Sequence, residues 1–192
     1  RGQCHDDECT QESHLDHDND TRRAAPPVHA KITYVPGMAE YVATITWSGS
    51  AAPEDFVKGR YSREHTWTFD GGVIVPASPA PTSVPKPWSN PANVDPEEAF
   101  VAALSSCHML TFLWVAMKKG FSATSYVDRA VGVMTKNERG VPWVSKVTLH
   151  PTIEWSGDKR PTAAELDELH HAAHEGCYIA QSVKTDVVVA TS

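Results

Sequence analysis

Two cysteines in the body of the chain, Cys107 and Cys177, are the residues with the clearest capacity for chemistry. Cys107 lies in an apolar stretch that starts at residue 95, and Cys177 follows a second segment with helical spacing. A single buried cysteine is usually an inert small hydrophobic residue. A pair on separate elements is what a two-thiol redox centre requires, because one thiolate is oxidised to a sulfenic acid and the second thiol condenses with it into a disulfide. These two interpretations of Cys107 both stay open at this point.

A reactive cysteine needs a cation nearby, because a free thiol has a pKa of about 8.5. A guanidinium is suited to this role, since it stays charged and can hold a carboxylate while it faces a thiolate. The candidates are Arg60 and Arg63, which both lie in a predicted strand, 59–69. Alternation along a strand places them on opposite faces. We favour Arg63, because it shares a face with Tyr61 and His65.

Two histidine patterns suggest other chemistry. His108 directly follows Cys107, but neighbours on a helix point about 100° apart, so a cysteine–histidine hydrolase pair is the weaker interpretation. His170 and His174 are spaced i, i+4, with Cys177 one turn further, and that spacing can bind a metal. The other interpretation is a polar helix surface near a subunit interface, and we expect no metal and no cofactor. A non-catalytic metal- or small-ligand-binding dimer is the alternative function.

The elements that position these residues follow from the periodicity of the chain. Alternating β-branched and aromatic residues predict strands at 40–47, 59–69 and 71–78, and the last two are joined by an Asp-Gly hairpin. A proline-rich loop over 78–94 comes next.

The strongest prediction is a helix from 96 to about 119. Asp95 is its expected N-cap, Glu98 completes a capping box and Gly120 stops the helix. Apolar residues occupy most of its faces, so we expect a long buried central helix.

The C-terminal part predicts two strands within 124–155, joined around 138–140. A second helix with a capping box follows Thr162 and ends at Gly176, and a strand over 182–190 closes the domain. The order of elements, with hairpins instead of βαβ units, indicates an α+β fold with mainly antiparallel sheets.

Composition excludes several classes of function. The chain has 192 residues and a net charge of −7 without a block of Lys and Arg, which argues against nucleic-acid binding. No run of about 18 uninterrupted apolar residues predicts a membrane span. Four cysteines are too few for a disulfide scaffold, so a cytoplasmic location is favoured. We expect residues 1–37 to be a disordered tail or upstream translation, and 38–192 to form the domain.

Two segments carry a resemblance to a known family. DPEEAFVAALSSCHMLTFL, residues 95–113, resembles the helix of the OsmC/Ohr thiol-dependent peroxidases, with its Pro-Glu-Glu start and a cysteine ten residues after the first Glu. GCYIAQSVKTDVVV, residues 176–189, resembles the second-cysteine segment of that family. FDGG and GVMTKNERG resemble the OsmC-like branch, and the resemblance covers most of the chain from Met38 to Val189.

The resemblance implies an intertwined homodimer that reduces organic hydroperoxides in oxidative-stress defence, with two active sites at the subunit interface. Cys107 would be the peroxidatic thiol, Cys177 the resolving thiol, and Glu97 the carboxylate that holds an activating arginine. Arg60 sits where the Ohr branch carries its arginine, whereas Arg63 lies in a YSREH segment typical of the OsmC-like branch. An external dithiol of lipoyl or thioredoxin type would reduce the disulfide. Apolar side chains that would line the site and favour organic peroxides are Phe100, Leu104, Trp114 and Trp88.

Geometry adds a constraint on Glu97. Ten residues along one straight helix separate it from Cys107 by about 15 Å. Either the helix breaks near 101–105, or the carboxylate serves a cysteine of another chain. A third interpretation is that Glu97 only supplies favourable charge at the helix N-terminus.

Overall fold

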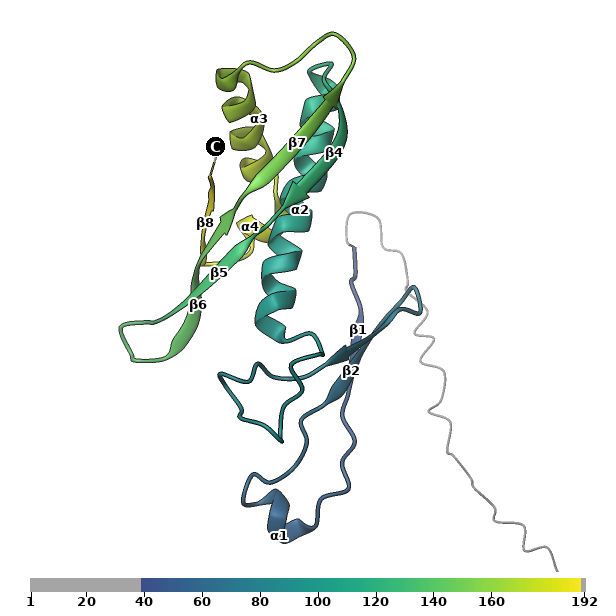
Figure 1. The fold of residues 1–192 in the computed structure, drawn as a ribbon, viewed down its shortest axis with the longest axis vertical. Helices are drawn as coiled ribbons and strands as arrows, with labels where there is room; N and C mark the ends of the chain where they lie inside the picture. Colours follow the sequence, from purple (N-terminus) through teal and green to yellow (C-terminus); the bar gives the residue numbers. More distant parts are fainter. Residues whose placement is uncertain (1–38, 191–192) are drawn as a thin grey trace, which may run out of the picture. The chain divides into compact units, whose positions relative to one another are not determined.

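The computed structural model describes residues 39–190, and the compact unit within it begins at Tyr41. The predicted tail, residues 1–37, lies outside the described residues and stays a prediction. Figure 1 shows a mixed arrangement in which antiparallel strand pairs and a second helix accompany one long helix. The predicted α+β class with mainly antiparallel sheets is therefore confirmed.

The first sheet is a three-stranded antiparallel meander. Its strands are β1 (Ala43–Thr46), β2 (His65–Phe69) and β3 (Ile74–Ala77). The turn between β2 and β3 forms at Asp70, whose Oδ1 accepts the Gly71 N–H at 2.8 Å. Gly72 follows with a φ of 83°, a conformation that residues with a Cβ rarely adopt. The hairpin predicted from the Asp-Gly pair is confirmed.

The predicted strand 59–69 is wrong over its first six positions, since β2 begins only at His65. A short helix, α1 (Pro53–Phe56), precedes a turn in which the Arg60 N–H donates to the Asp55 carbonyl at 2.9 Å. Gly59, with a φ of 74°, reverses the chain there. Both candidate arginines thus belong to a loop, residues 57–64, and strand alternation says nothing about where they point.

The long helix forms where it was predicted. α2 (Pro96–Lys118) begins with the expected capping box, in which Asp95 accepts the Glu98 N–H at 2.8 Å and the Glu98 carboxylate accepts the Asp95 N–H at 3.3 Å. It continues for 23 residues without a break. A break near 101–105 is therefore excluded as the way to bring Glu97 to Cys107.

Four strands, not two, occupy the segment after α2. They are β4 (Ser122–Asp128), β5 (Val131–Lys136), β6 (Pro142–Leu149) and β7 (Pro151–Ser156). β5 and β6 form the hairpin predicted around 138–140, while β4 pairs with β7 in a separate sheet. The change of sheet happens at Asp128, whose Oδ1 accepts the His150 N–H at 2.6 Å and joins the two corners.

The C-terminal elements return to α2. α3 (Ala163–Glu175) has the predicted capping box at Thr162 and Glu165 and is followed by Gly176 as its C-cap. A short helix that was not predicted, α4 (Tyr178–Gln181), leads to β8 (Asp186–Val189), which pairs in parallel with β6.

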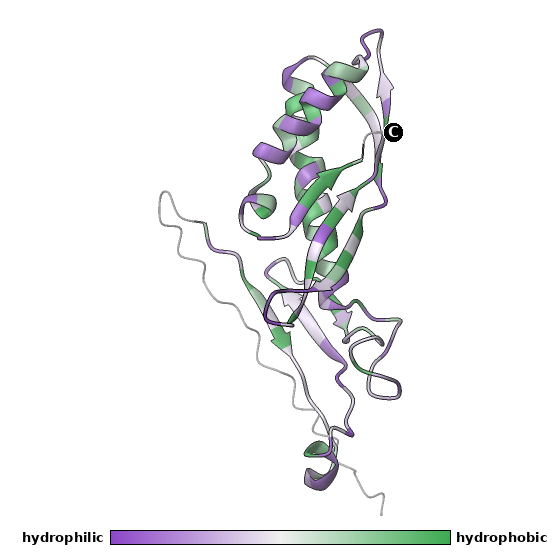
Figure 2. Ribbon diagram, turned by 90° about the vertical axis from the view of Figure 1, so that its left-hand side faces the viewer, coloured by the Kyte–Doolittle hydropathy of each residue, from purple (hydrophilic) through white to green (hydrophobic). Residues whose placement is uncertain are grey.

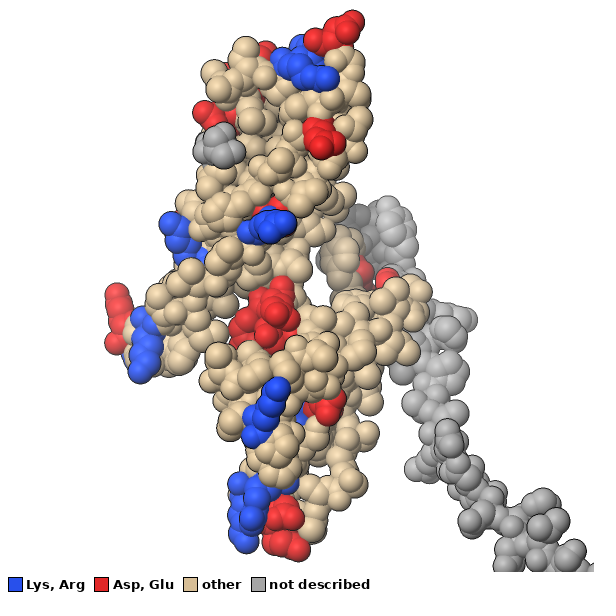
Figure 3. All heavy atoms as spheres, viewed as in Figure 1, with Lys and Arg blue, Asp and Glu red and all other residues tan. Residues whose placement is uncertain are grey.

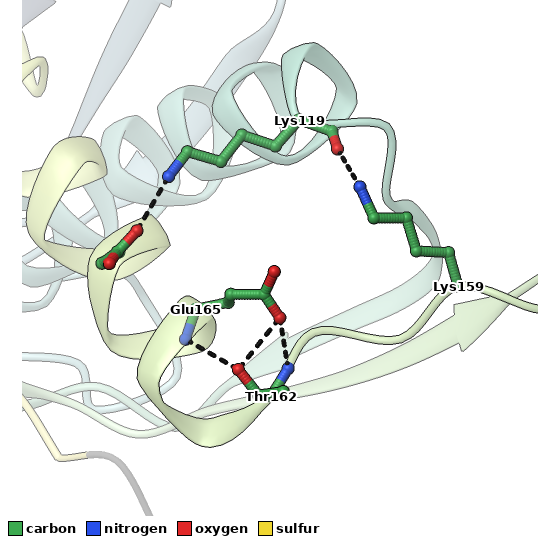
Figure 4. Close-up of polar contacts among 5 residues, drawn as sticks. Lys119, Lys159, Thr162 and Glu165 are labelled. Atoms are coloured by element: carbon green, nitrogen blue, oxygen red, sulfur yellow. Dashed lines mark hydrogen bonds and ion pairs between the residues drawn. The ribbon is translucent and has the colours of Figure 1, made fainter.

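Two lysines connect the C-terminal end of α2 with α3 and the segment before it. Lys119 Nζ lies 3.0 Å from a carboxylate oxygen of Glu168, and Lys159 Nζ donates to the Lys119 carbonyl at 2.6 Å (Figure 4). The Thr162–Glu165 capping box lies beside these contacts (Figure 4). The Lys119–Glu168 ion pair joins the C-terminal end of α2 to α3, so the two helices are held together at the surface as well as in the core.

One face of α2 is buried within the chain and the other is exposed. Its buried residues, Leu104, His108, Phe112, Val115 and Ala116, pack against α3, α4 and strands of the two C-terminal sheets. Apolar residues nevertheless run around much of α2 (Figure 2). Length and composition alone would let α2 cross a membrane, but its buried face packs like that of a core helix. The expected burial on most sides is not reached within a single chain.

Candidate active site

The structure brings Cys107 and Cys177 together from two separate elements. Cys107 lies in α2 and is partly exposed, whereas Cys177 is the N-cap of α4 and is 1% exposed. The Ile179 N–H donates to Cys107 Sγ at 3.5 Å, and the Ala180 N–H donates to Cys177 Sγ at 3.4 Å. Adjacent N–H groups of α4 thus contact the two sulfurs, and the Cys107 side chain is close enough to raise the pKa of Cys177. The two sulfurs are therefore neighbours within one chain.

The environments of the two thiols differ. Burial, and secondarily the neighbouring Cys107 side chain, raises the pKa of Cys177 to about 11. At neutral pH this side chain is consequently a protonated thiol, which is a poor nucleophile. Cys107 is the more accessible of the pair.

The side chains of the two arginine candidates make their polar contacts with residues close by in the sequence. Arg60 Nε lies 3.2 Å from Asp55 Oδ1. Arg63 donates from one guanidinium nitrogen to the carbonyls of Gly59 and Tyr61, at 3.2 and 3.0 Å, and its guanidinium lies 4.1 Å from the centre of the Tyr61 ring. Among residues 39–190, no hydrogen bond or ion pair joins either arginine to a thiol.

Arg63 lies at the wall of an aromatic cavity of about 380 Å³. Phe56 and Tyr61 stack with ring centres 4.4 Å apart, and the Trp47 ring meets Tyr61 edge-on at 5.7 Å. The residues that line this cavity are Ile45, Trp47, Phe56, Tyr61, Arg63, His65, Pro79 and Pro96. The sequence prediction missed Trp47 and Phe56. The signal was present in part, since Trp47 ends the strong alternating pattern of the first strand.

Glu97 faces a different and larger cavity, of about 790 Å³. Asp95 and Glu98 line it as well, and Figure 3 shows acidic side chains gathered near the N-terminal end of α2. Further along, the same cavity is lined by apolar side chains that include Val101 and Met109. Its lining contains neither cysteine and neither arginine candidate, so a single chain does not assemble Glu97, the arginine and the thiol.

The four predicted substrate-lining residues fall in different surroundings. Phe100 and Leu104 pack in the core beside β6, and Leu104 has no exposed surface. Trp114 is 58% exposed, with Lys118 Nζ 5.7 Å from the centre of its ring. Trp88 is half-buried, and its carbonyl accepts the Arg63 N–H at 3.2 Å, so it belongs to the surroundings of the arginine loop. Neither of the two cavities is lined by these four residues, and their role stays a prediction.

The exposed face of α2 is apolar and continuous with the position of Cys107. Helical spacing aligns Leu110, Trp114 and Met117, which are each more than half exposed. All six residues of the edge strand β5 are exposed too, including Val131 and Val133. Such apolar surface and an uncovered strand edge are typical of an interface.

His108 and His170 form a buried pair behind the thiols. His108 Nε2 lies 3.1 Å from His170 Nδ1, and burial, with a further contribution from His170 and His174, lowers the pKa of His108 to about 4. The polar-surface interpretation of His170 is therefore wrong, because this side chain is only 4% exposed. Among residues 39–190, no three His, Cys, Asp or Glu side chains are grouped to hold a metal ion.

Comparison with known proteins identifies the family of this fold. A family model described as "OsmC-like protein" matches residues 89–192, more than half of the chain. The chain belongs to the OsmC-like family. A solved structure of an OsmC-like protein of unknown function from Vibrio cholerae O1 biovar eltor is 52% identical, with a TM-score of 0.76, and covers 80% of this chain and 99% of that one.

More distant structures of the OsmC-like fold carry functional descriptions. An organic hydroperoxide resistance protein from Elizabethkingia anophelis is 18% identical, with a TM-score of 0.59, and covers 82% of this chain and 100% of that one. The organic hydroperoxide resistance protein OhrB of Bacillus subtilis is 20% identical, with a TM-score of 0.52, over 77% and 96% of the two chains. At these identities the likeness shows the fold alone. A search of curated proteins found no match.

Proposed function

We propose that this OsmC-like protein reduces organic hydroperoxides to alcohols by a two-thiol mechanism, in oxidative-stress defence in the cytoplasm. The observation that carries the proposal is the meeting of Cys107 and Cys177. One is partly exposed on α2, the other is enclosed at the start of α4, and adjacent backbone N–H groups of α4 donate to the two sulfurs. A pair that only filled the core would not need one exposed member.

The environments of the two thiols assign their order of reaction. The Cys107 thiolate attacks the terminal oxygen of the hydroperoxide, the O–O bond breaks, and the alkoxide takes a proton and leaves as the alcohol. Cys107 is then a sulfenic acid. The Cys177 thiol attacks its sulfur, the S–O bond breaks, and a disulfide and water form. An external dithiol, of lipoyl or thioredoxin type, restores both thiols and is itself oxidised to a disulfide.

Activation of Cys107 requires a cation, which we propose a second copy of the chain supplies. α2 is straight, so its own Glu97 is about 15 Å away along the helix. In a homodimer that buries the exposed stripe of α2 and the β5 edge, Glu97 of one chain would hold an arginine, Arg63 or Arg60, beside a cysteine of the other. The aromatic walls around Arg63 would then contact the apolar part of the peroxide.

The apolar part of the proposed site favours organic peroxides over hydrogen peroxide. Trp47, Phe56 and Tyr61 present large apolar surfaces in the cavity that contains Arg63. Of the lining residues predicted from the sequence, Trp88 is tied to this loop by a backbone hydrogen bond. Trp114 would contribute from the exposed face of α2.

The test is to mix the reduced protein with a slight excess of cumene hydroperoxide and follow both thiols and the intact mass. The expected result is stoichiometric loss of peroxide and a Cys107–Cys177 disulfide. In Cys177→Ser the expected product is a sulfenic acid on Cys107 that a dimedone-type reagent traps. If both thiols stay reduced in the wild-type protein, the peroxidase proposal fails, and a non-catalytic ligand-binding dimer becomes the better description.

A further inference from the structure

His108 and His170 connect the two helices that carry or precede the thiols. His108 follows Cys107 directly on α2, and His170 lies on α3 about two turns before Cys177. One ring N–H bridges His108 Nε2 and His170 Nδ1 at 3.1 Å, and the rings are nearly parallel, with centres 5.4 Å apart. The side chains are 1% and 4% exposed, so this is an internal polar contact.

The surroundings of the pair are apolar and tightly packed. The Phe112 ring stacks on His170 with ring centres 4.4 Å apart, and Phe112 and Leu169 have no exposed surface. His108 Nδ1 has no hydrogen-bond partner among residues 39–190. A buried polar atom without a partner is unfavourable, and an aromatic hydrocarbon would fill the same space without that cost. Packing alone therefore does not explain why two histidines lie here. The directional hydrogen bond between them suggests a specific function for the pair.

The segment between α3 and Cys177 is closely packed and has little freedom to move. A Cβ built on Gly176 would lie 2.9 Å from Thr111 Cγ2 of α2, closer than ordinary packing allows. The Cys177 N–H donates to the His174 carbonyl at 3.2 Å, which ties it to the last turn of α3. A shift of α3 along α2 would consequently move the Cys177 sulfur relative to Cys107.

We propose that the His108–His170 pair is a positioning device for the dithiol, which fixes α3 against α2 and so holds the two sulfurs within bonding reach. The inference rests on the proposed function only in its second step, where Cys107–SOH and Cys177–SH form a disulfide and water. Neither histidine contacts a sulfur in any hydrogen bond of the described chain, so both are positioning residues and not catalytic ones.

The test measures the equilibrium between dithiol and disulfide in the full-length protein, in buffers of reduced and oxidised dithiothreitol. His108→Phe keeps an aromatic ring but removes the hydrogen bond, and we expect it to lower the disulfide equilibrium constant about five- to tenfold. His108→Gln places an amide near the former Nε2 and should restore most of the loss. His171→Gln, an exposed change on α3 beside His170, should match the wild type.

A stability control separates positioning from general weakening of the core. Leu169→Ala removes apolar contacts from the same α2–α3 core but leaves both histidines. It should lower the melting temperature while the disulfide equilibrium constant stays within about twofold of the wild type. The proposal is overturned if His108→Phe matches the wild type, or if Leu169→Ala lowers the constant as much as His108→Phe does. If His108→Phe does not fold, His170→Leu and His170→Asn repeat the comparison from the other side.

The stepwise readout keeps this proposal apart from the peroxidase proposal. The dithiothreitol buffer contains no peroxide, so the equilibrium reports on the sulfurs even if the protein consumes none. With cumene hydroperoxide, His108→Phe should form the sulfenic acid at the wild-type rate and close the disulfide more slowly. Equal slowing of both steps would contradict a positioning role.

Discussion

A single chain assembles two parts of the proposed site to different degrees. One part is the region around the thiols, and the other is the loop that carries the arginines. In the dithiol region, which comprises α2, α3 and α4, core packing, a histidine pair and helix caps place two sulfurs side by side. In the arginine loop, residues 57–64, Arg63 contacts carbonyls of its own loop and lines an aromatic cavity that contains neither sulfur, while Arg60 pairs with Asp55. As we propose, the step in which Cys177 forms the disulfide uses two thiols of one chain. Activation of Cys107 requires a second copy of the chain.

Charge and burial explain the difference. Thiols are small and weakly polar, so one chain can enclose them in a core at little cost. A guanidinium is always charged and is costly to bury without a partner, so it stays at the surface until an interface supplies a carboxylate. An exposed apolar stripe and a free strand edge are the surface on which such an interface would form.

The largest expected effect falls on Cys107. Cys107→Ser removes the nucleophile, and we expect peroxide consumption to fall by about a thousandfold or more. Cys177→Ser should keep the first turnover at the wild-type rate and block the second. The measurement is peroxide loss in single- and multiple-turnover experiments. Retained turnover in Cys107→Ser would show that the dithiol region is not where the reaction occurs.

Acid should weaken the dithiol region through its histidines. The pKa of His108 falls from 6.5 to about 4 on folding, so the unfolded chain takes up a proton first as the pH drops. The penalty for protonating the buried ring is therefore absent above pH 6.5, and it lowers the free energy of unfolding by about 3 kcal/mol as the pH falls towards 4. Burial lowers the pKa of His170 too, which adds in the same direction.

Urea unfolding at pH 7 and pH 4 measures this loss, and His108→Gln supplies the reference, because carboxylates that titrate near pH 4 affect both proteins equally. His171→Gln, an exposed change on α3 beside His170, should leave the pH dependence as it is in the wild type. An equal drop in stability for wild type and His108→Gln would contradict the assignment to His108.

In the arginine loop we expect Arg63→Gln to slow sulfenic-acid formation about ten- to a hundredfold, since loss of a nearby cation raises the pKa of the attacking thiol. Arg60→Gln should have the smaller effect, because Arg60 is paired with Asp55. Stopped-flow measurement of the peroxide step compares the two. Equal rates for Arg63→Gln and wild type, with a slow Arg60→Gln, would exchange the two roles.

Mixed dimers sharpen the same comparison. Arg63→Gln and Cys107→Ser are each impaired at a different part of the proposed shared site. If the arginine comes from the partner, a mixture of the two proteins after subunit exchange should recover activity that neither has alone.

The smallest expected effect concerns the helix caps. Thr162→Ala removes the N-cap of α3 and should lower the free energy of unfolding by about 1 kcal/mol without changing the rate of the peroxide step. Asp95→Ala removes the N-cap of α2 and should lower the free energy of unfolding by a similar amount. Because Asp95 lines the same cavity as Glu97, this variant should also slow the peroxide step. Identical peroxide rates for the two variants would mean that the cavity at the start of α2 takes no part in activation.

Sequence reasoning succeeded where the controlling interactions are local. Both capping boxes, the Asp70–Gly71 turn and the ends of α2 and α3 depend on side chains within a few residues of the backbone groups that they satisfy. The likeness of the two cysteine segments to the OsmC/Ohr family was also readable from short motifs, and the family is confirmed.

Sequence-based prediction failed where contacts between different segments of the chain determine the local structure. The strand expected at 59–64 is a loop because α1 and Gly59 turn the chain, and two expected strands became four because Asp128 anchors a corner next to His150. His170 looked like surface from its helical spacing and proved to be core, since Phe112 and His108 from another helix cover it.

The sequence by itself determined the two long helices with their caps, the α+β class and the two thiols, because each depends on residue types and short spacings. Only the tertiary structure decided that Cys107 and Cys177 are neighbours, that a histidine pair lies behind them, and that the arginine loop and Glu97 face separate cavities. The physical reason is that these relations depend on how α2 packs against α3 and on which surfaces burial leaves free. Neither is encoded within the few residues that a local pattern spans.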